Sequence, residues 1–346
     1  MRAVAGPVLG PLALEQALLR DRARAKHPRG AELWWTPDAL EQATSAPVAA
    51  WRAQRYPDPV LDLCCSVGGD LMALPHGSVG VDLDEARLLL ARENAAVLQR
   101  DVRLVRADAT RLRLAGDVFV DPARRSGGRR VFDPRAYAPP LDVVLGWRSV
   151  ARRLGVKVAP GVDHEALPDD VEVDVVSLAG EVKEAVLWCG QARSGARRTA
   201  TLLPGGDVLR ERAVPTPTVR PPGRYLLEPD GAVVRSHLVA QVADDVGGWL
   251  LDATIAYVAA DEPVRTPFGR WYAVHESFPF SLKGLRARLR ALDVGTVVVK
   301  KRGTAVEPEE LRRRLALSGS RTATVVLTRC AGRQSVLLVD PLERPG

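Results

Sequence analysis

Three acidic residues, Asp82, Asp108 and Asp121, each end or follow a short apolar run, a place where carboxylates can bind a ligand. Asp82 comes roughly 20 residues after the small-residue stretch at 64–69, the spacing at which a carboxylate meets a ribose hydroxyl. Small residues let the backbone approach a ligand closely, and the N–H groups of a following helix can face it. Together these residues predict a ligand site built at the ends of several strands.

The elements that position these residues read as apolar runs, each followed by a turn or a helical pattern, which is typical of an open α/β sheet. The apolar runs at residues 171–178 and 182–188 are close in sequence and form a predicted hairpin. Helical patterns lie at residues 71–74, 86–97 and 141–154. The predicted strands lie at residues 60–63, 80–84, 102–105, 117–120, 156–159, 171–178, 182–188 and 200–203.

This series resembles the class I S-adenosylmethionine-dependent methyltransferases, which have a Rossmann-like sheet. In that family the turn after the first strand holds the methionine part of the cofactor. The acid that ends the second strand takes the ribose hydroxyls, and the acid after the third strand approaches the adenine amine. The resemblance therefore implies S-adenosyl-L-methionine as cofactor. The cofactor-binding residues that it implies are Asp62, Cys64, Ser66, Gly68, Asp82 and Asp108.

The motif after the fourth strand lines the methyl-transfer site in that family. Here it reads D-P-A-R-R from residue 121, and the resemblance implies Asp121, Pro122 and Arg124 as catalytic residues. Asp121 would accept a hydrogen bond or a proton from an attacking amine, and Pro122 would fix the loop. Arg124 would hold a phosphate or the edge of a base. Methyl transfer from a sulfonium is an in-line displacement, so alignment is the main task of such residues.

Two motifs depart from the family pattern. The usual first motif is D-x-G-x-G-x-G, but Cys64 and Ser66 replace its first two glycines, and each adds a Cβ that must fit the turn. In amino-methylating nucleic-acid enzymes the fourth motif is [DNS]-P-P-[YFW], whereas this chain has no aromatic residue there to stack on a base. RNA uracil-5 methyltransferases carry a similar D-P-P-R-x-G, but residues 156–161 lack the nucleophilic cysteine that those enzymes need. A base nitrogen is therefore the expected target.

The amino-acid composition limits which classes of protein the chain can belong to. The chain has 346 residues, 46% apolar and 26% charged, which is ordinary for a globular protein with more than one domain. No apolar run approaches the roughly 20 residues needed to span a bilayer, and no signal peptide is apparent, so we expect a cytoplasmic protein without membrane partners.

Four cysteines without C-x-x-C spacing predict neither a metal site nor a disulfide framework. G-x-G-x-x-G is absent, which disfavours a dinucleotide-binding domain.

The chain divides into three predicted parts. Residues 1–55 read as a helical extension, with Thr36 and Pro37 at a helix start. Residues 56–213 form the predicted methyltransferase domain, and the proline-rich stretch at 214–222 is a linker. An α+β domain follows at 223–346. Its predicted helices lie at 236–250, 281–292 and 308–315, and its predicted strands at 253–259, 271–276, 296–300, 322–328 and 335–339.

Basic residues concentrate in this last domain. Residues 281–334 contain 13 Lys and Arg but only four Asp and Glu, a net charge of +9 against +7 for the whole chain. Such a concentration is expected of a nucleic-acid clamp beside a catalytic domain. Residues 297–303, with 281–283 and 262–264, resemble the THUMP-like domain that follows a methyltransferase core in a family of bacterial, notably actinobacterial, proteins. By analogy with THUMP domains, this resemblance implies a structured RNA, tRNA or rRNA, as partner.

The basic residues predicted to contact RNA are Arg125, Arg129, Lys283, Lys300, Lys301 and Arg302. Two other functions stay open at this point. A non-catalytic RNA-binding protein could retain the cofactor fold as a scaffold, and the missing glycines and aromatic residue motivate that alternative. A methyltransferase acting on a small molecule or a protein is the other, although the basic domain argues against it.

Overall fold

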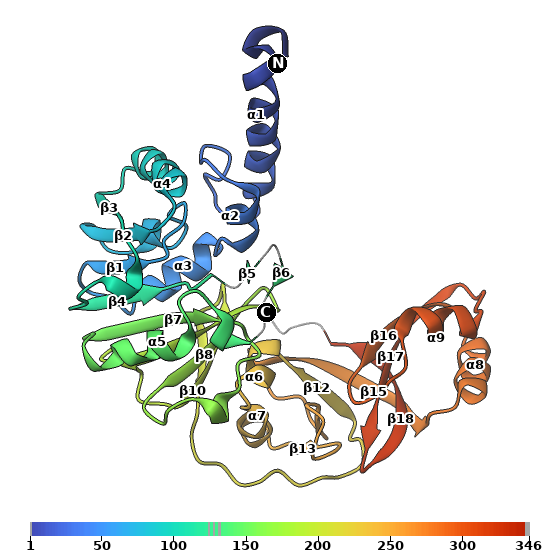
Figure 1. Cartoon of the computed structure of the whole chain (residues 1–346). Coiled ribbons are helices and arrows are strands. Elements are labelled where there is room, and N and C mark those ends of the chain that lie inside the picture. Colours follow the sequence, from blue (N-terminus) through green and yellow to red (C-terminus); the bar gives the residue numbers. More distant parts are fainter. Residues whose placement is uncertain (1, 124, 127–128, 131–132, 343–346) are drawn as a thin grey trace. The chain divides into compact units, whose positions relative to one another are not determined.

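The computed structural model describes residues 2–123, 125–126, 129–130 and 133–342, and side chains are described outside residues 2–8 and 125–130. The chain divides into two compact units, Met1–Arg197 and Arg198–Gly346, which are drawn in Figure 1. Within the described residues, no helix has the length and apolar character needed to cross a bilayer.

The first unit is built on a mostly parallel sheet with the strand order β8-β9-β7-β4-β1-β2-β3. Strand β1 lies between β2 and β4, and β9 runs antiparallel to both of its neighbours. This arrangement confirms the expected α/β class and its Rossmann-like sheet. The strands are β1 (Val60–Leu63), β2 (Ser78–Asp82), β3 (Val102–Arg106), β4 (Asp117–Val120), β7 (Arg153–Val158), β8 (Glu172–Leu178) and β9 (Glu181–Gly190), with a small hairpin of β5 (Arg125–Ser126) and β6 (Arg129–Arg130).

The helices of this unit include the extension that precedes the sheet. Thr36 caps its second helix, because the Thr36 Oγ1 accepts a hydrogen bond from the Ala39 N–H at 3.1 Å. Leu19, Leu33, Trp35 and Leu40 pack with Val67, which lies in the turn after β1. The extension is therefore anchored on that turn. The α-helices are α1 (Arg2–Ala23), α2 (Pro37–Gln42), α3 (Ala46–Ala53), α4 (Glu85–Leu98) and α5 (Leu141–Gly146).

The second unit is α+β. After the hairpin of β10 (Arg198–Leu203) and β11 (Asp207–Arg210), a sheet has the order β13-β14-β12-β15-β18-β17-β16. Helices α8 (Leu282–Ala291) and α9 (Pro308–Leu315) pack leucines on one face of it, and Figure 1 shows them beside β16. The other elements are β12 (Tyr225–Pro229), α6 (Gly231–Arg235), α7 (Val239–Asp245), β13 (Trp249–Leu250), β14 (Val258–Ala260), β15 (Gly269–Pro279), β16 (Val294–Lys301), β17 (Arg321–Cys330) and β18 (Arg333–Pro341).

Three expected helices are shorter than their patterns predict. After the turn at 64–70 only one 3₁₀ turn forms, Leu71–Ala73, because Pro75 disfavours a helical Leu74. The helix expected at 236–250 ends at Asp245, and Gly247 then takes a left-handed φ of 61°.

The helix expected at 141–154 ends at Gly146, and β7 begins already at Arg153. The reason is tertiary. Arg153 pairs with Asp117 of β4 both in the strand register and through its guanidinium, 3.3 Å from the Asp117 Oδ2. Strand pairing thus overrides the local helical pattern. The strand expected at 253–259 is reduced to β14. The residues before β14 begin with a turn instead, in which the Asp252 carboxylate accepts a hydrogen bond from the Thr254 N–H.

Candidate active site

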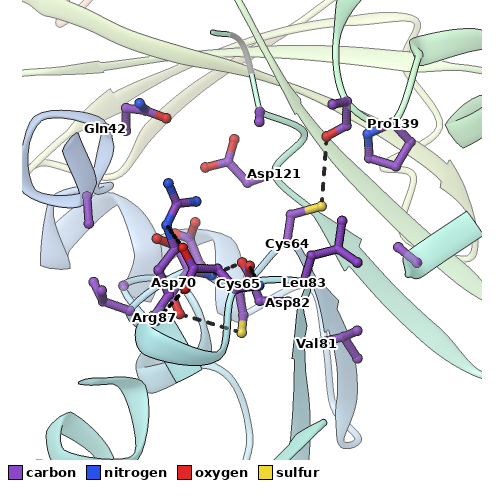
Figure 2. A pocket seen from close by; sticks show the side chains of 18 of the residues that line it. Gln42, Cys64, Cys65, Asp70, Val81, Asp82, Leu83, Arg87, Asp121 and Pro139 are labelled. Carbon is purple, nitrogen blue, oxygen red and sulfur yellow. Dashed lines mark hydrogen bonds and ion pairs between the residues drawn. The ribbon is translucent and has the colours of Figure 1, made fainter. Parts of the chain in front are cut away.

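A cavity of about 470 Å³ opens at the carboxyl ends of β1, β2 and β4. Five of the predicted site residues line it, and Figure 2 shows three of them, Cys64, Asp82 and Asp121, around the space. The extension contributes Ala39, Gln42, Ala43 and Thr44 to the lining of the cavity. The strand ends therefore bring together the predicted residues Cys64, Ser66, Asp82, Asp108 and Asp121.

The turn after β1 keeps a glycine-type backbone without most of the glycines. Cys64, Ser66 and Gly68 have φ values of 63°, 52° and 86°, all in the left-handed region. That region costs a non-glycine residue about 1–2 kcal/mol. The two replacements noted in the sequence are thus accommodated in a strained backbone, which brings the chain close to the cavity. Gly68 itself is not among the lining residues.

Asp82 is fixed by the turn that it faces. Its two carboxylate oxygens accept the Ser66 N–H and the Asp84 N–H, each at 2.9 Å. A carboxylate has about four acceptor positions, so Asp82 can still receive two hydroxyl groups. Leu83, the next residue, is 65% exposed and lines the cavity, where it offers an apolar surface to a flat ring.

Asp108 stands at the start of the 3₁₀ turn Ala109–Arg111 and lines the same cavity. Hydrogen bonds from the Thr110 hydroxyl and N–H, at 2.7 and 2.9 Å, lower the pKa of Asp108. The carboxylate therefore stays ionised at neutral pH and can accept a hydrogen bond from an amine.

The charge of the cavity selects among ligands. Among the lining residues are five carboxylates but one cation, Arg87. Such a wall attracts a ligand with an ammonium and a sulfonium and repels a pyrophosphate. The residues present therefore fit S-adenosylmethionine, and they disfavour the dinucleotide that a doubly wound sheet could otherwise bind. In the described part of the chain, no cluster of His, Cys, Asp and Glu offers a set of metal ligands.

Asp62 lies within β1, and its side chain does not line the cavity. This side chain is buried and has no hydrogen-bond partner among the described residues. Burial, followed by the charge of Asp70, raises the pKa of Asp62 well above its usual range, which favours the protonated form of this carboxyl group. Direct contact of Asp62 with the cofactor stays a prediction.

Asp121 follows β4 and forms an ion pair with Lys157, a residue that was not predicted from the sequence. The Lys157 Nζ of β7 lies 2.6 Å from the Asp121 Oδ2 and 4.0 Å from the Asp70 Oδ2. It also donates to the Thr44 Oγ1 at 2.8 Å. The signal that could have revealed Lys157 is a single lysine within the apolar run of a predicted central strand, where a charge must have a partner.

A second buried cation connects the extension to the turn. The Arg52 guanidinium of α3 donates to Asp70 and to Glu184 of β9, and it lies 4.2 Å over the Phe119 ring. Against the cost of burial, Asp70 and Glu184 raise the pKa of Arg52. Since Asp70 lines the cavity, α3 helps to position one of the cavity's lining residues through Arg52.

The rest of the predicted transfer motif is only partly described. Pro122 is buried and does not line the cavity, whereas Ala123 does. Arg124 lies outside the described residues, and for Arg125 and Arg129 the structure describes only the backbone, in β5 and β6. Their roles stay predictions.

An aromatic residue from outside the D-P-A-R-R motif lines the cavity. Tyr137 is buried and lines it, held by a backbone pairing of Ala123 with Ala138 at 2.9 and 3.0 Å. The sequence placed Tyr137 in the following loop, and nothing in the sequence indicated that this loop returns to Asp121.

The predicted RNA contacts of the second unit differ in their surroundings. Lys300 lies 2.6 Å from Glu228, and Lys301 lies 2.6 Å from Glu307. Arg302 donates to the Ala256 carbonyl at 2.8 Å. Lys283 is exposed and makes no ion pair or side-chain hydrogen bond among the described residues.

Comparison with known proteins agrees with this geometry. A family model described as THUMP domain-like matches residues 269–341. An uncharacterized S-adenosylmethionine-dependent methyltransferase, found in two strains of Mycobacterium tuberculosis, is 42% identical over 334 residues, which are 92% of this chain and 92% of that protein. The crystal structure of a presumed methyltransferase of Porphyromonas gingivalis has a TM-score of 0.76 at 22% identity, over 94% of this chain and 88% of that one. The last similarity shows a shared fold.

Proposed function

Because the chain belongs to the S-adenosylmethionine-dependent methyltransferases, we propose that it methylates a base nitrogen of a structured RNA, tRNA or rRNA. The observation that carries this proposal is the position of Asp121. Its carboxylate lines the cavity together with the turn after β1 and Asp82, the residue predicted to bind the ribose. A fixed acceptor at that place suits an incoming N–H group.

The cofactor supplies a methyl group that is already activated, so the residues of this chain mainly bind and align. Asp82 and Asp108 would hold the ribose hydroxyls and the adenine amine. Asp121 would accept a hydrogen bond from the attacking amine and so direct the nitrogen lone pair into the cavity. Tyr137 adds an aromatic side chain to the lining of the same cavity.

The thiols at the cavity support a nitrogen target over a pyrimidine carbon. Uracil-5 methylation needs a thiolate that attacks the base. The cysteines that line the cavity are Cys64 and Cys65, both in the cofactor turn. Burial, followed by nearby carboxylates, raises the pKa of both thiols, which keeps them protonated and poorly nucleophilic at neutral pH.

Support for RNA as the substrate comes from the second unit. Its THUMP domain-like region spans residues 269–341, and residues 281–334 have a net charge of +9. By analogy, THUMP domains bind structured RNA, and a positive surface attracts its phosphates.

The test is transfer of a labelled methyl group from S-adenosylmethionine to fractionated cellular RNA, protein and small molecules. We expect label in an RNA fraction with the wild-type protein and not with Asp121→Ala, while both proteins bind S-adenosylhomocysteine. Label only in protein or in small molecules would overturn RNA as the substrate. Cofactor binding without transfer to any fraction would favour a non-catalytic scaffold.

A further inference from the structure

The charge pair between Asp121 and Lys157 is shielded from solvent on one side and open to the cavity on the other. The Lys157 side chain is 4% exposed and that of Asp121 is 24% exposed, and of the two only Asp121 lines the cavity. The ammonium therefore approaches the carboxylate from behind, and the remaining oxygen surface of Asp121 is free to face a substrate.

The extension completes the surroundings of this ammonium. Thr44, between α2 and α3, accepts a hydrogen bond from the Lys157 Nζ, and the Gln42 carbonyl at the end of α2 lies 3.5 Å away. Lys157 thus joins β7, the loop after β4 and the extension at one atom. Thr44 and Gln42 also line the cavity, and Figure 2 shows the Gln42 and Asp121 side chains at the same end of it.

Without this cation, Asp121 would stand in an acidic and poorly solvated place. Burial and neighbouring negative charges both favour the protonated form of a carboxyl group. Against the cost of burial, Asp121 and then Asp70 raise the pKa of Lys157, so the ammonium stays charged. The charged and titratable groups that face the pair from the surrounding elements are Lys26, Arg52, Asp62, Cys64, Asp70 and Glu184.

We propose that Lys157 is a positioning residue for methyl transfer, which keeps Asp121 ionised and directed into the cavity so that it accepts the N–H of the substrate. Thr44 of the extension holds the ammonium in place. The identity of the N–H group rests on the proposed function, whereas the ionisation of Asp121 does not.

A readout without any methyl acceptor tests the ionisation. The ratio of the dissociation constants of S-adenosylhomocysteine and S-adenosylmethionine reports how strongly the cavity prefers a sulfonium cation. In Lys157→Met, the Asp121 carboxylate loses its neighbouring ammonium, and its acidic surroundings favour the protonated form. The preference for the cation should then increase severalfold at high pH, where the carboxylate is ionised and unpaired, and return to the wild-type value at low pH, where it is protonated. The wild-type ratio should change little between about pH 6 and 8.5.

Transfer activity gives the second readout. We expect Lys157→Met to lose at least about tenfold in kcat at pH 7, with a loss that grows as pH falls because Asp121 takes up a proton. Lys157→Arg should restore most of the rate. The double variant Lys157→Met/Asp121→Asn should be no slower than Asp121→Asn alone, since both changes act through one carboxylate.

Lys183→Met is the matched control, because Lys183 is a partly exposed lysine paired with Glu181 on β9. It should leave the ratio and the pH profile unchanged. A Lys157→Met protein that folds, with a wild-type ratio at every pH and an unshifted pH profile, would overturn the proposal. If Lys157→Met does not fold, Thr44→Val decides. A shift of its pH profile in the same direction supports the proposal, and an unshifted profile contradicts it. Failure of RNA to accept label would leave the binding ratio as an intact test.

Discussion

The cavity of the first unit and the basic region of the second unit use charge in opposite ways. At the cavity, carboxylates from the ends of several strands converge on one space that a cation fits. In the basic region, many of the positive side chains hold the unit itself together. Arg290, for instance, donates to the Ala316 carbonyl at the end of α9, at 3.1 Å. Lys300 is only 27% exposed and lies against Glu228.

The two regions differ in how well their functional residues can be predicted from the sequence. A motif at a strand end predicts a site, because the sheet itself fixes where that end must lie. A net charge of +9 predicts a field, but it does not say which of the cations are free to meet a phosphate.

Asp121→Asn should have the largest effect. The amide keeps the shape of the side chain but loses the negative charge that pairs with Lys157 and the second strong acceptor. We expect kcat to fall by about 100- to 1000-fold while the dissociation constant of S-adenosylhomocysteine changes less than about threefold. Single-turnover methyl transfer and calorimetry measure the two quantities. An unchanged rate would remove Asp121 from the transfer site.

Asp82→Ala should affect the cofactor rather than the RNA. The variant loses the predicted bonds to the ribose hydroxyls and also the acceptor of the Ser66 N–H, so we expect cofactor affinity to fall by about 10- to 100-fold. RNA affinity should stay at the wild-type value. Equal cofactor affinity in variant and wild type would refute the ribose assignment.

Two triple variants separate the cations of the second unit. Lys283, Arg313 and Arg333 are exposed and make no ion pair among the described residues. Their replacement by Ala should weaken RNA binding and reduce its salt slope by up to about 2–3. Electrophoretic or fluorescence titrations at several salt concentrations measure this slope. A slope equal to that of the wild type would show that these residues lie away from the RNA.

The matched triple variant changes the three residues at 300–302 to Ala. The sequence alone predicts RNA contacts there, whereas the ion pair with Glu228 predicts mainly a loss of stability, about 1–2 kcal/mol. Chemical denaturation and the same salt titration are measured side by side. A reduced salt slope with unchanged stability would favour the sequence-based interpretation.

Changes in the turn after β1 should have the smallest effect. Ser66 has a left-handed φ, so Ser66→Gly relieves backbone strain and should change the free energy of unfolding by no more than about 1 kcal/mol, without loss of cofactor binding. Ser66→Val places a β-branched residue in the same backbone and should destabilise by about 1–2 kcal/mol. Thermal melts with and without S-adenosylhomocysteine compare the two. A more stable Val variant would contradict the assigned backbone.

The sequence predicted the cavity residues that follow parallel strands, such as Asp82 and Asp121, since a strand and its end can be recognised locally. It did not predict Lys157 as a partner of Asp121, because the two are brought together by the pairing of β4 with β7. The helix expected at 141–154 failed for the same reason, since Arg153 pairs with Asp117 across the sheet. Local pattern thus predicted elements and their ends, while partners that depend on sheet pairing required the structure.

The chemical identity of the methylated product tests the proposed function most directly. Structured RNA is incubated with the protein and S-adenosylmethionine carrying a labelled methyl group, then digested to nucleosides and analysed by mass spectrometry. We expect a nucleoside labelled on a base nitrogen with the wild type, and at least about 100-fold slower labelling with Asp121→Asn. Label on a pyrimidine carbon or on a ribose hydroxyl, or equal labelling by the Asp121→Asn variant, would contradict the proposed function.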